Sequence, residues 1–69
     1  MNMKENPPTC NINGVFCAKV TCAELGISYR DLRKLRKLGL IKPTNPGNRH
    51  RPKFLGQAIH DCWEKMKLL

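Results

Sequence analysis

The residues best suited to chemistry in this sequence are its four cysteines and two histidines. Cys10, Cys17 and Cys22 are separated by six and four residues, and Cys62 follows His60 by two. Structural zinc sites usually draw two ligands from one Cys-x-x-Cys turn, and no such pair occurs here. The N-terminus lacks the apolar segment of a secretory signal, so we expect reduced thiols. The sequence therefore predicts no metal site and no disulfide, and cysteines that serve as small apolar residues.

No other combination of residues predicts catalysis. The sequence contains no Gly-rich phosphate loop, and no Ser or Cys has a plausible His and carboxylate partner. We therefore expect no enzyme activity, no catalytic residue and no cofactor. Because no apolar run approaches the roughly 20 residues of a membrane span, we also expect no membrane partner.

Positive charge is the most distinctive property of the chain. Its 69 residues include thirteen Lys and Arg but only five Asp and Glu, which gives a formal net charge of +8. Such an excess attracts polyanions, and nucleic acid is the commonest of these. The cations gather in two clusters, one at residues 29–38 and one at residues 49–53.

Signals for helices and turns place the first cluster on a helix. Residues 1–13 are polar and predict a flexible arm, followed by one domain at 14–69. Thr21 begins a Thr-x-x-Glu capping box, which predicts a short helix that ends at Gly26. Ser28 is a second N-cap signal and opens a helix at 29–38, with Gly39 at the left-handed position after it. Two helices so close together are typical of a helix-turn-helix.

The rest of the chain predicts a hairpin and a last helix. Val15–Val20 is capable of forming a short strand or the run-in to the first helix. The Asn-Pro-Gly-Asn turn at 45–48 predicts a hairpin whose second strand lies at 49–54, and Pro52 limits it to a sheet edge. A helix at 56–67 would present an apolar stripe to the core, formed by Ile59, Cys62, Trp63 and Met66.

The helix at 29–38 is predicted to have an apolar face and a basic face. At about 100° per residue, three leucines share one side of it: Leu32, Leu35 and Leu38. The cations gather on the other side: Arg30, Arg33, Lys34 and Lys37, with Arg36 near the boundary. Asp31 is the one acid, close to the positive helix start. A solvated surface helix would interleave Glu with these cations, so the absence of Glu favours a face that binds nucleic acid.

Several of these residues resemble the DNA-binding half of MerR-type regulators. That family has a Gly-Val-Ser turn, then Leu-Arg, then Gly-Leu-Leu or Gly-Leu-Ile before a basic residue or Pro. Here Gly26–Arg33 and Lys37–Pro43 match in register, and the likeness covers about Val20 to Phe54. It implies that Arg33 lies on a recognition helix, that Arg49 and Arg51 lie on a wing, and that Phe54 is the aromatic residue after the wing.

The chain also departs from the MerR pattern. Cys22 replaces an alanine, Lys34 and Leu35 replace aromatic residues, and Pro52 interrupts the wing strand. A chain that ends at Leu69 leaves no room for the dimerisation helix and effector domain of that family. We expect it to be more similar to the excisionases of phages and mobile elements, and to the DNA-binding domains of phage terminase small subunits.

Together these observations predict an α+β, mainly α fold, a small winged helix-turn-helix with a short β-hairpin wing and a C-terminal helix. The expected function is sequence-specific DNA binding by an excisionase or small transcription regulator. Helix 29–38 would enter the major groove, and the wing at 42–54 would contact the backbone or minor groove. The predicted DNA-binding residues are Thr21, Ser28, Tyr29, Arg30, Arg33, Lys34, Arg36, Lys37, Arg49, His50, Arg51 and Lys53.

The expected partner is double-stranded DNA, with an integrase or further cooperatively bound copies of the chain as additional partners, in the cytoplasm at the nucleoid. Two alternatives stay open. RNA is one, because attraction to phosphate does not distinguish the two nucleic acids, although Tyr29 is the one aromatic residue expected to be free for stacking. The other is a small protein-binding module that acts on an acidic partner.

Overall fold

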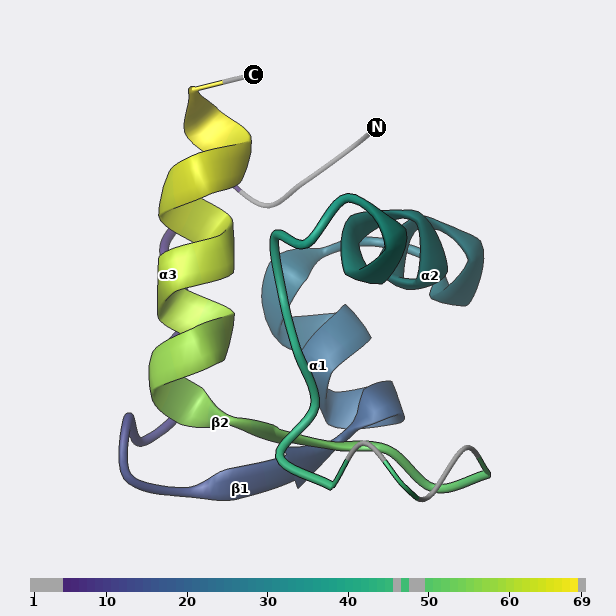
Figure 1. Ribbon diagram of the computed structural model, residues 1–69. Coiled ribbons are helices and arrows are strands. Elements are labelled where there is room, and N and C mark those ends of the chain that lie inside the picture. Colours follow the sequence, from purple (N-terminus) through teal and green to yellow (C-terminus); the bar gives the residue numbers. More distant parts are fainter. Residues whose placement is uncertain (1–4, 46, 48–49, 69) are drawn as a thin grey trace.

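Three helices and a two-stranded sheet form the described part of the fold in the computed structural model, which covers residues 5–45, 47 and 50–68 (Figure 1). In chain order the elements are β1 (Val15–Cys17), α1 (Ala18–Leu25), α2 (Tyr29–Lys37), β2 (Lys53–Leu55) and α3 (Gly56–Lys67). The strands pair antiparallel, with Phe16 opposite Phe54. The expected α+β, mainly helical class is confirmed.

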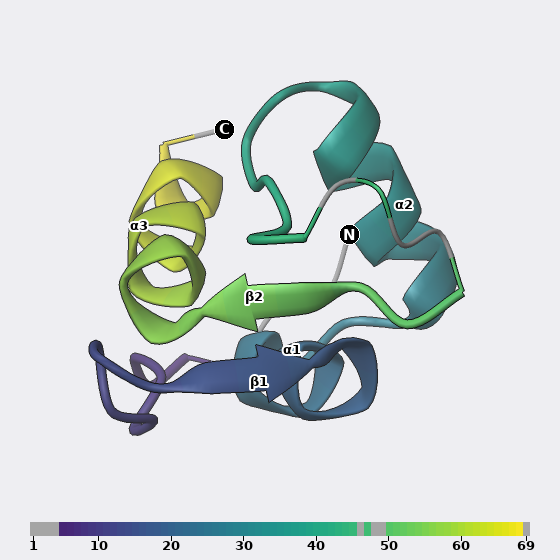
Figure 2. The ribbon, with the colours of Figure 1, turned by 60° about the horizontal axis from the view of Figure 1, so that its bottom comes forward.

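The helices surround a common core, and the sheet closes one end of it. Figure 1 shows α3 on one side, α2 on the other and α1 between them, with the two strands crossing below. Figure 2 shows the strands side by side at this end. The first part of the segment after α2 passes between α2 and α3, and its Ile41 is buried in the core.

Helix α1 begins earlier than the sequence predicts. Cys17 is extended, with a ψ of 170°, and the chain passes directly from β1 into the helix at Ala18. Thr21 is therefore inside the helix, and its hydroxyl donates to the Cys17 carbonyl at 2.9 Å. The expected Thr21 N-cap is wrong, because the Thr-x-x-Glu spacing of a capping box lies within the helix here. The ending at Gly26 is confirmed, with a φ of 70°.

Helix α2 begins and ends as the sequence predicts. The Ser28 hydroxyl accepts the Asp31 amide at 3.2 Å, which satisfies one of the unpaired donors of the first turn. At the other end Leu38 is the C-cap, and Gly39 has the left-handed φ of 76°. Leu38 is expected on the apolar face, but it is 59% exposed and lies outside the core. The reason is that it follows the last residue of the helix.

Helix α3 follows β2 without a polar N-cap, and the N-terminal segment takes the place of one. The amides of Gly56 and Gln57 donate to the carbonyls of Gly14 and Ile12 at 2.8 and 3.0 Å. Further along, His60 Nε2 lies 2.8 Å from the Cys10 carbonyl oxygen. Part of the segment 1–13, expected to be a flexible arm, thus contacts the domain. These backbone carbonyls satisfy donors that a helix start otherwise leaves unpaired.

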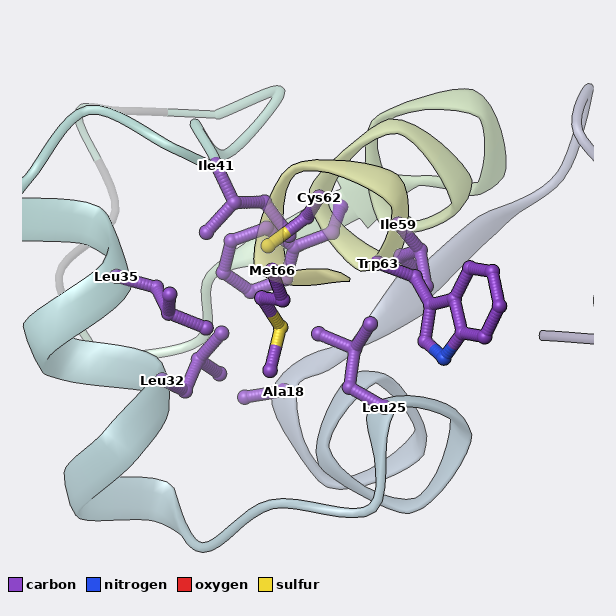
Figure 3. Packing of buried hydrophobic residues seen from close by; sticks show 10 residues of the cluster. Ala18, Leu25, Leu32, Leu35, Ile41, Ile59, Cys62, Trp63 and Met66 are labelled. Atoms are coloured by element: carbon purple, nitrogen blue, oxygen red, sulfur yellow. The ribbon is translucent and has the colours of Figure 1, made fainter. Parts of the chain in front are cut away.

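The core draws side chains from all three helices, from β2 and from the segment after α2. Figure 3 shows Leu32 and Leu35 of α2 directed toward Met66 of α3, with Leu25 of α1 beside it. The buried apolar residues are Ala18, Leu25, Leu32, Leu35, Ile41, Phe54, Ile59, Cys62, Trp63 and Met66. The predicted stripe on α3 is therefore confirmed, since all four of its members are buried.

The predicted hairpin of residues 49–54 is corrected by the strand pairing. Among the described residues there, Lys53–Leu55 forms the one strand, and it pairs with Val15–Cys17 instead of with the segment that follows α2. Pro52 has no amide to donate to a ladder, which explains why β2 begins after it. Residues 46, 48 and 49 of the expected wing lie outside the described residues.

The helices of the described part are also too short or too polar to cross a membrane.

We predict that Gly56→Ala destabilises the protein by about 1–3 kcal/mol, because its methyl group would collide with the Asn11 carbonyl oxygen. The collision would push away the segment that caps α3. Urea unfolding of the two proteins measures the difference.

Gly47→Ala is the matched control, since a methyl group there meets no atom within 4 Å. Its free energy of unfolding should stay within about 0.5 kcal/mol of the parent value. Equal stabilities of the two variants would contradict the capping role of residues 11–14.

Candidate nucleic-acid interface

The basic face of α2 forms one wall of an open groove. Burial of Leu32 and Leu35 turns the opposite side of the helix outward. The other wall is the segment 41–43, and the groove between them has a volume of about 840 Å³. Six cations line it: Arg30, Arg33, Lys34, Arg36, Lys37 and Lys42. The structure therefore brings together all five α2 cations that the sequence singled out.

Arg36 has a more restricted position than the other cations of this groove. It is half-buried, and its guanidinium carbon lies 5.9 Å from the centre of the Phe54 ring, which is fully buried in β2. A guanidinium over an aromatic ring at this distance makes a favourable cation–π contact. Arg36 therefore links α2 to β2 while its charge remains at the groove.

The groove is free of compensating negative charge from the chain itself. All five acidic residues lie in the described part, and none of them lines this groove. Burial raises the pKa of the Cys22 thiol in α1, and the nearby Asp31 carboxylate acts in the same direction. Glu24 accepts the Thr9 amide at 3.0 Å. The repulsion among the groove cations is therefore left for an external anion to relieve.

The segment between α2 and β2 is closed into a loop by the side chain of Asn45. Its amide nitrogen donates to the Arg51 carbonyl at 3.0 Å, and its Oδ1 accepts the Lys53 amide at 2.7 Å. The Thr44 amide donates to the Lys53 carbonyl at 2.7 Å. These bonds bring residues 44–45 beside residues 51–53 without a ladder of strands, so the basic residues after the turn stay close to the sheet.

Arg51 and Lys53 of this loop line a second, smaller cleft. It has a volume of about 230 Å³ and lies where the starts of α1 and α2 meet residues 50–53. Tyr29 lines it and is 50% exposed. Its other lining residues are Cys17, Ala18, Lys19, His50, Arg51, Pro52 and Lys53. Here too, none of the five acidic residues takes part.

The position of Cys17 at the start of α1 lowers the pKa of its thiol. Hydrogen bonding from the Val20 amide at the start of α1 lowers the pKa of Cys17, and the Lys19 amide and the Lys53 charge act in the same direction. Burial raises the pKa of the three other thiols, and that of Cys62 reaches about 11. Cys17 is thus the cysteine with the greatest fraction of thiolate near neutral pH.

Two of the predicted DNA-binding residues have structural roles, and a third lies outside the described residues. Thr21 is fully buried and bonded to the Cys17 carbonyl, so its inclusion is corrected. Ser28 is exposed, but its hydroxyl caps α2. Arg49 is outside the described residues.

Three further residues contribute to this surface although the sequence did not single them out. Lys42 and Lys19 each complete the cationic lining of one groove, and Asn45 holds the loop. The excess of cations in the composition was a signal for both lysines, but their places depend on how the segments pack. Asn45 stood in a recognised turn, and its side-chain bonds depend on the backbone path of residues 51–53.

The four cysteines are free thiols in the structure: Cys62 is buried and the other three are half-buried. Cys10 and Cys22 pack against the core, as expected for small apolar residues, whereas Cys17 lines the second cleft. Within the described residues, no group of three or more His, Cys, Asp and Glu side chains is arranged to hold a metal ion.

Comparisons of the chain with models of protein families, with curated proteins and with solved structures found no match.

We predict that Cys17 reacts with iodoacetamide faster than the other three cysteines near pH 8. The thiolate is the reactive form, and the lowered pKa of Cys17 raises its thiolate fraction while the pKa values of the others are raised. Mass spectrometry of peptides measures the alkylation at each site.

Unfolding in urea provides the control, because it removes the helix start and the burial together. The four rates should then become similar. A folded protein in which Cys22 reacts as fast as Cys17 would contradict the electrostatic description of the second cleft.

Proposed function

We propose that this chain is a sequence-specific DNA-binding protein of winged helix-turn-helix type, in which α2 enters the major groove of duplex DNA. The loop at 42–53 then acts as a wing on the neighbouring backbone or minor groove. The observation that carries the proposal is the groove lined by six cations, five from α2 together with Lys42. No acidic residue lines this groove.

The connection between the first two helices supports this assignment. α1 ends at Leu25, α2 begins at Tyr29, and the three residues between them include the left-handed Gly26. A short turn with glycine between two packed helices is typical of a helix-turn-helix, whose second helix lies in the major groove. Arg33 and Arg30 are exposed on α2 and are suited to paired hydrogen bonds with guanine.

The loop at 42–53 supports a wing in its position and charge, although its described residues form no hairpin ladder of their own. Residues 50–53 of the loop lie beside the start of α2, because they line the same cleft as Tyr29. Arg51 and Lys53 follow the turn and are exposed. Cations beside a recognition helix contact phosphates, which fix the orientation of the protein on the duplex.

The biological output that we propose is that of an excisionase or a small transcription regulator. The support for this narrower proposal is the likeness of residues 26–33 and 37–43 to the DNA-binding half of MerR-type regulators, together with the small one-domain size that suggests an excisionase. In either role the protein would be associated with the nucleoid, and an integrase or further copies of the chain would be its partners on the DNA.

Binding to RNA or to an acidic protein makes different demands on this surface. Recognition of single-stranded RNA usually uses two or three exposed aromatic side chains, and Tyr29 is the one exposed aromatic residue of this chain. If the natural partner were an acidic protein, the chain would bind DNA through charge alone and would not prefer one base sequence to another. The experiment is to select a DNA duplex from a random pool and to compare the affinity of the protein for this duplex with its affinity for RNA of the same sequence. This comparison distinguishes the three kinds of partner.

We predict that Arg33→Ala weakens binding to the selected duplex by about 1–3 kcal/mol, because it removes a base contact from the exposed face of α2. The thermal melt should be unchanged, since Arg33 is exposed. Fluorescence anisotropy measures the affinity and calorimetry measures the melt.

Lys65→Ala is the matched control, because it removes one exposed charge from α3, which lies on the other side of the molecule. Its affinity should remain close to that of the parent protein. If the two substitutions weaken binding equally, diffuse net charge accounts for the affinity and α2 is not the recognition helix.

A further inference from the structure

The second cleft has a property that the groove of α2 lacks, an exposed aromatic ring. All four aromatic residues lie in the described part of the chain. Phe54 and Trp63 are buried, and Phe16 packs against the core. Tyr29 alone is exposed, and it lines the cleft at the first position of α2. The next residue in the chain, Arg30, lines the main groove.

The surroundings of Tyr29 favour an anionic ligand. Lys19 extends from the start of α1, and His50, Arg51 and Lys53 come from the loop on the other side. None of the five acidic residues of the chain lines this cleft, so its cations are not balanced by a carboxylate there. Cations around a flat aromatic ring are the arrangement that proteins use for a nucleotide, with the base stacked and the phosphate paired.

The size of the cleft limits what it accommodates. Its volume of about 230 Å³ corresponds to about eight water molecules at liquid density, which is the scale of one nucleobase. A base pair inside a duplex cannot present its face to Tyr29, because both of its faces are stacked on neighbouring pairs. The cleft is therefore suited to a base that has left the duplex.

We propose that this cleft binds one unpaired nucleotide of a DNA strand that leaves the duplex held by α2, with its base stacked on Tyr29 and its phosphate near Lys19 and Lys53. This proposal rests on the proposed function, because the duplex positions the strand. It predicts that the protein prefers a duplex with a single-stranded overhang to the same duplex with blunt ends.

The test compares two DNA ligands that share one duplex, one with blunt ends and one with a four-thymidine overhang. We expect about tenfold tighter binding of the overhang DNA, since stacking of one base on an aromatic side chain contributes on that order. The preference should persist in Tyr29→Phe, which keeps the ring, and should fall to about one in Tyr29→Leu, which keeps the bulk. Overhangs at the 5′ and 3′ ends are measured separately, and a preference at either end supports the proposal.

Two controls separate this proposal from a general effect of charge. Lys65→Ala, on α3, should keep the tenfold preference. At equal saturation, alkylation of Cys17 should be slower with the overhang DNA than with the blunt duplex, because Cys17 lines the same cleft.

The outcomes for the cleft and for the proposed function are distinguishable. Equal affinities for the two ligands, or a preference that survives in Tyr29→Leu, would overturn the cleft proposal while duplex binding stands. Failure to bind any blunt duplex would instead overturn the proposed function.

Discussion

Burial of Leu32 and Leu35 sets the rotation of α2 about its own axis. Both side chains are directed into the core toward Met66, and each contributes roughly 1.5–3 kcal/mol through the apolar surface removed from water (Figure 3). Any other rotation would bury arginine or lysine. The apolar side of α2 therefore fixes the outward direction of its cations, and the groove exists because the core holds the helix in this orientation.

The loop after α2 depends on the same core. Ile41 is buried just past the helix, and Phe54 is buried where the loop returns to the sheet, so both ends of the loop are anchored. Between these anchors Asn45 bonds to the backbone on either side of Pro52. The Arg36 guanidinium over Phe54 then ties the helix to the far end of the loop. The two basic surfaces consequently keep a defined spacing.

Local signals predicted α2 and α3 well, because the Ser28 cap and leucine spacing of α2 and the apolar stripe of α3 all act within a few residues. The same reasoning failed at Thr21, where a capping-box spacing lies inside a helix that begins directly after a strand. It also failed for the hairpin, since the pairing of β1 with β2 joins residues about 40 positions apart, and no local pattern encodes that choice. The cations of α2 followed from periodicity, whereas the places of Lys19 and Lys42 depended on tertiary packing.

The most direct test of this account is an NMR titration of the isotopically labelled protein with a short DNA duplex at low salt. Contact through α2 and the loop predicts that the largest shifts of backbone amide signals occur at residues 29–37, 42–45 and 50–53. The signals of α3 between Asp61 and Lys67 should change little, because that helix lies on the other side of the molecule (Figure 1). Shifts concentrated on α3, or spread evenly over the surface, would contradict the assignment of α2 as the DNA-binding helix.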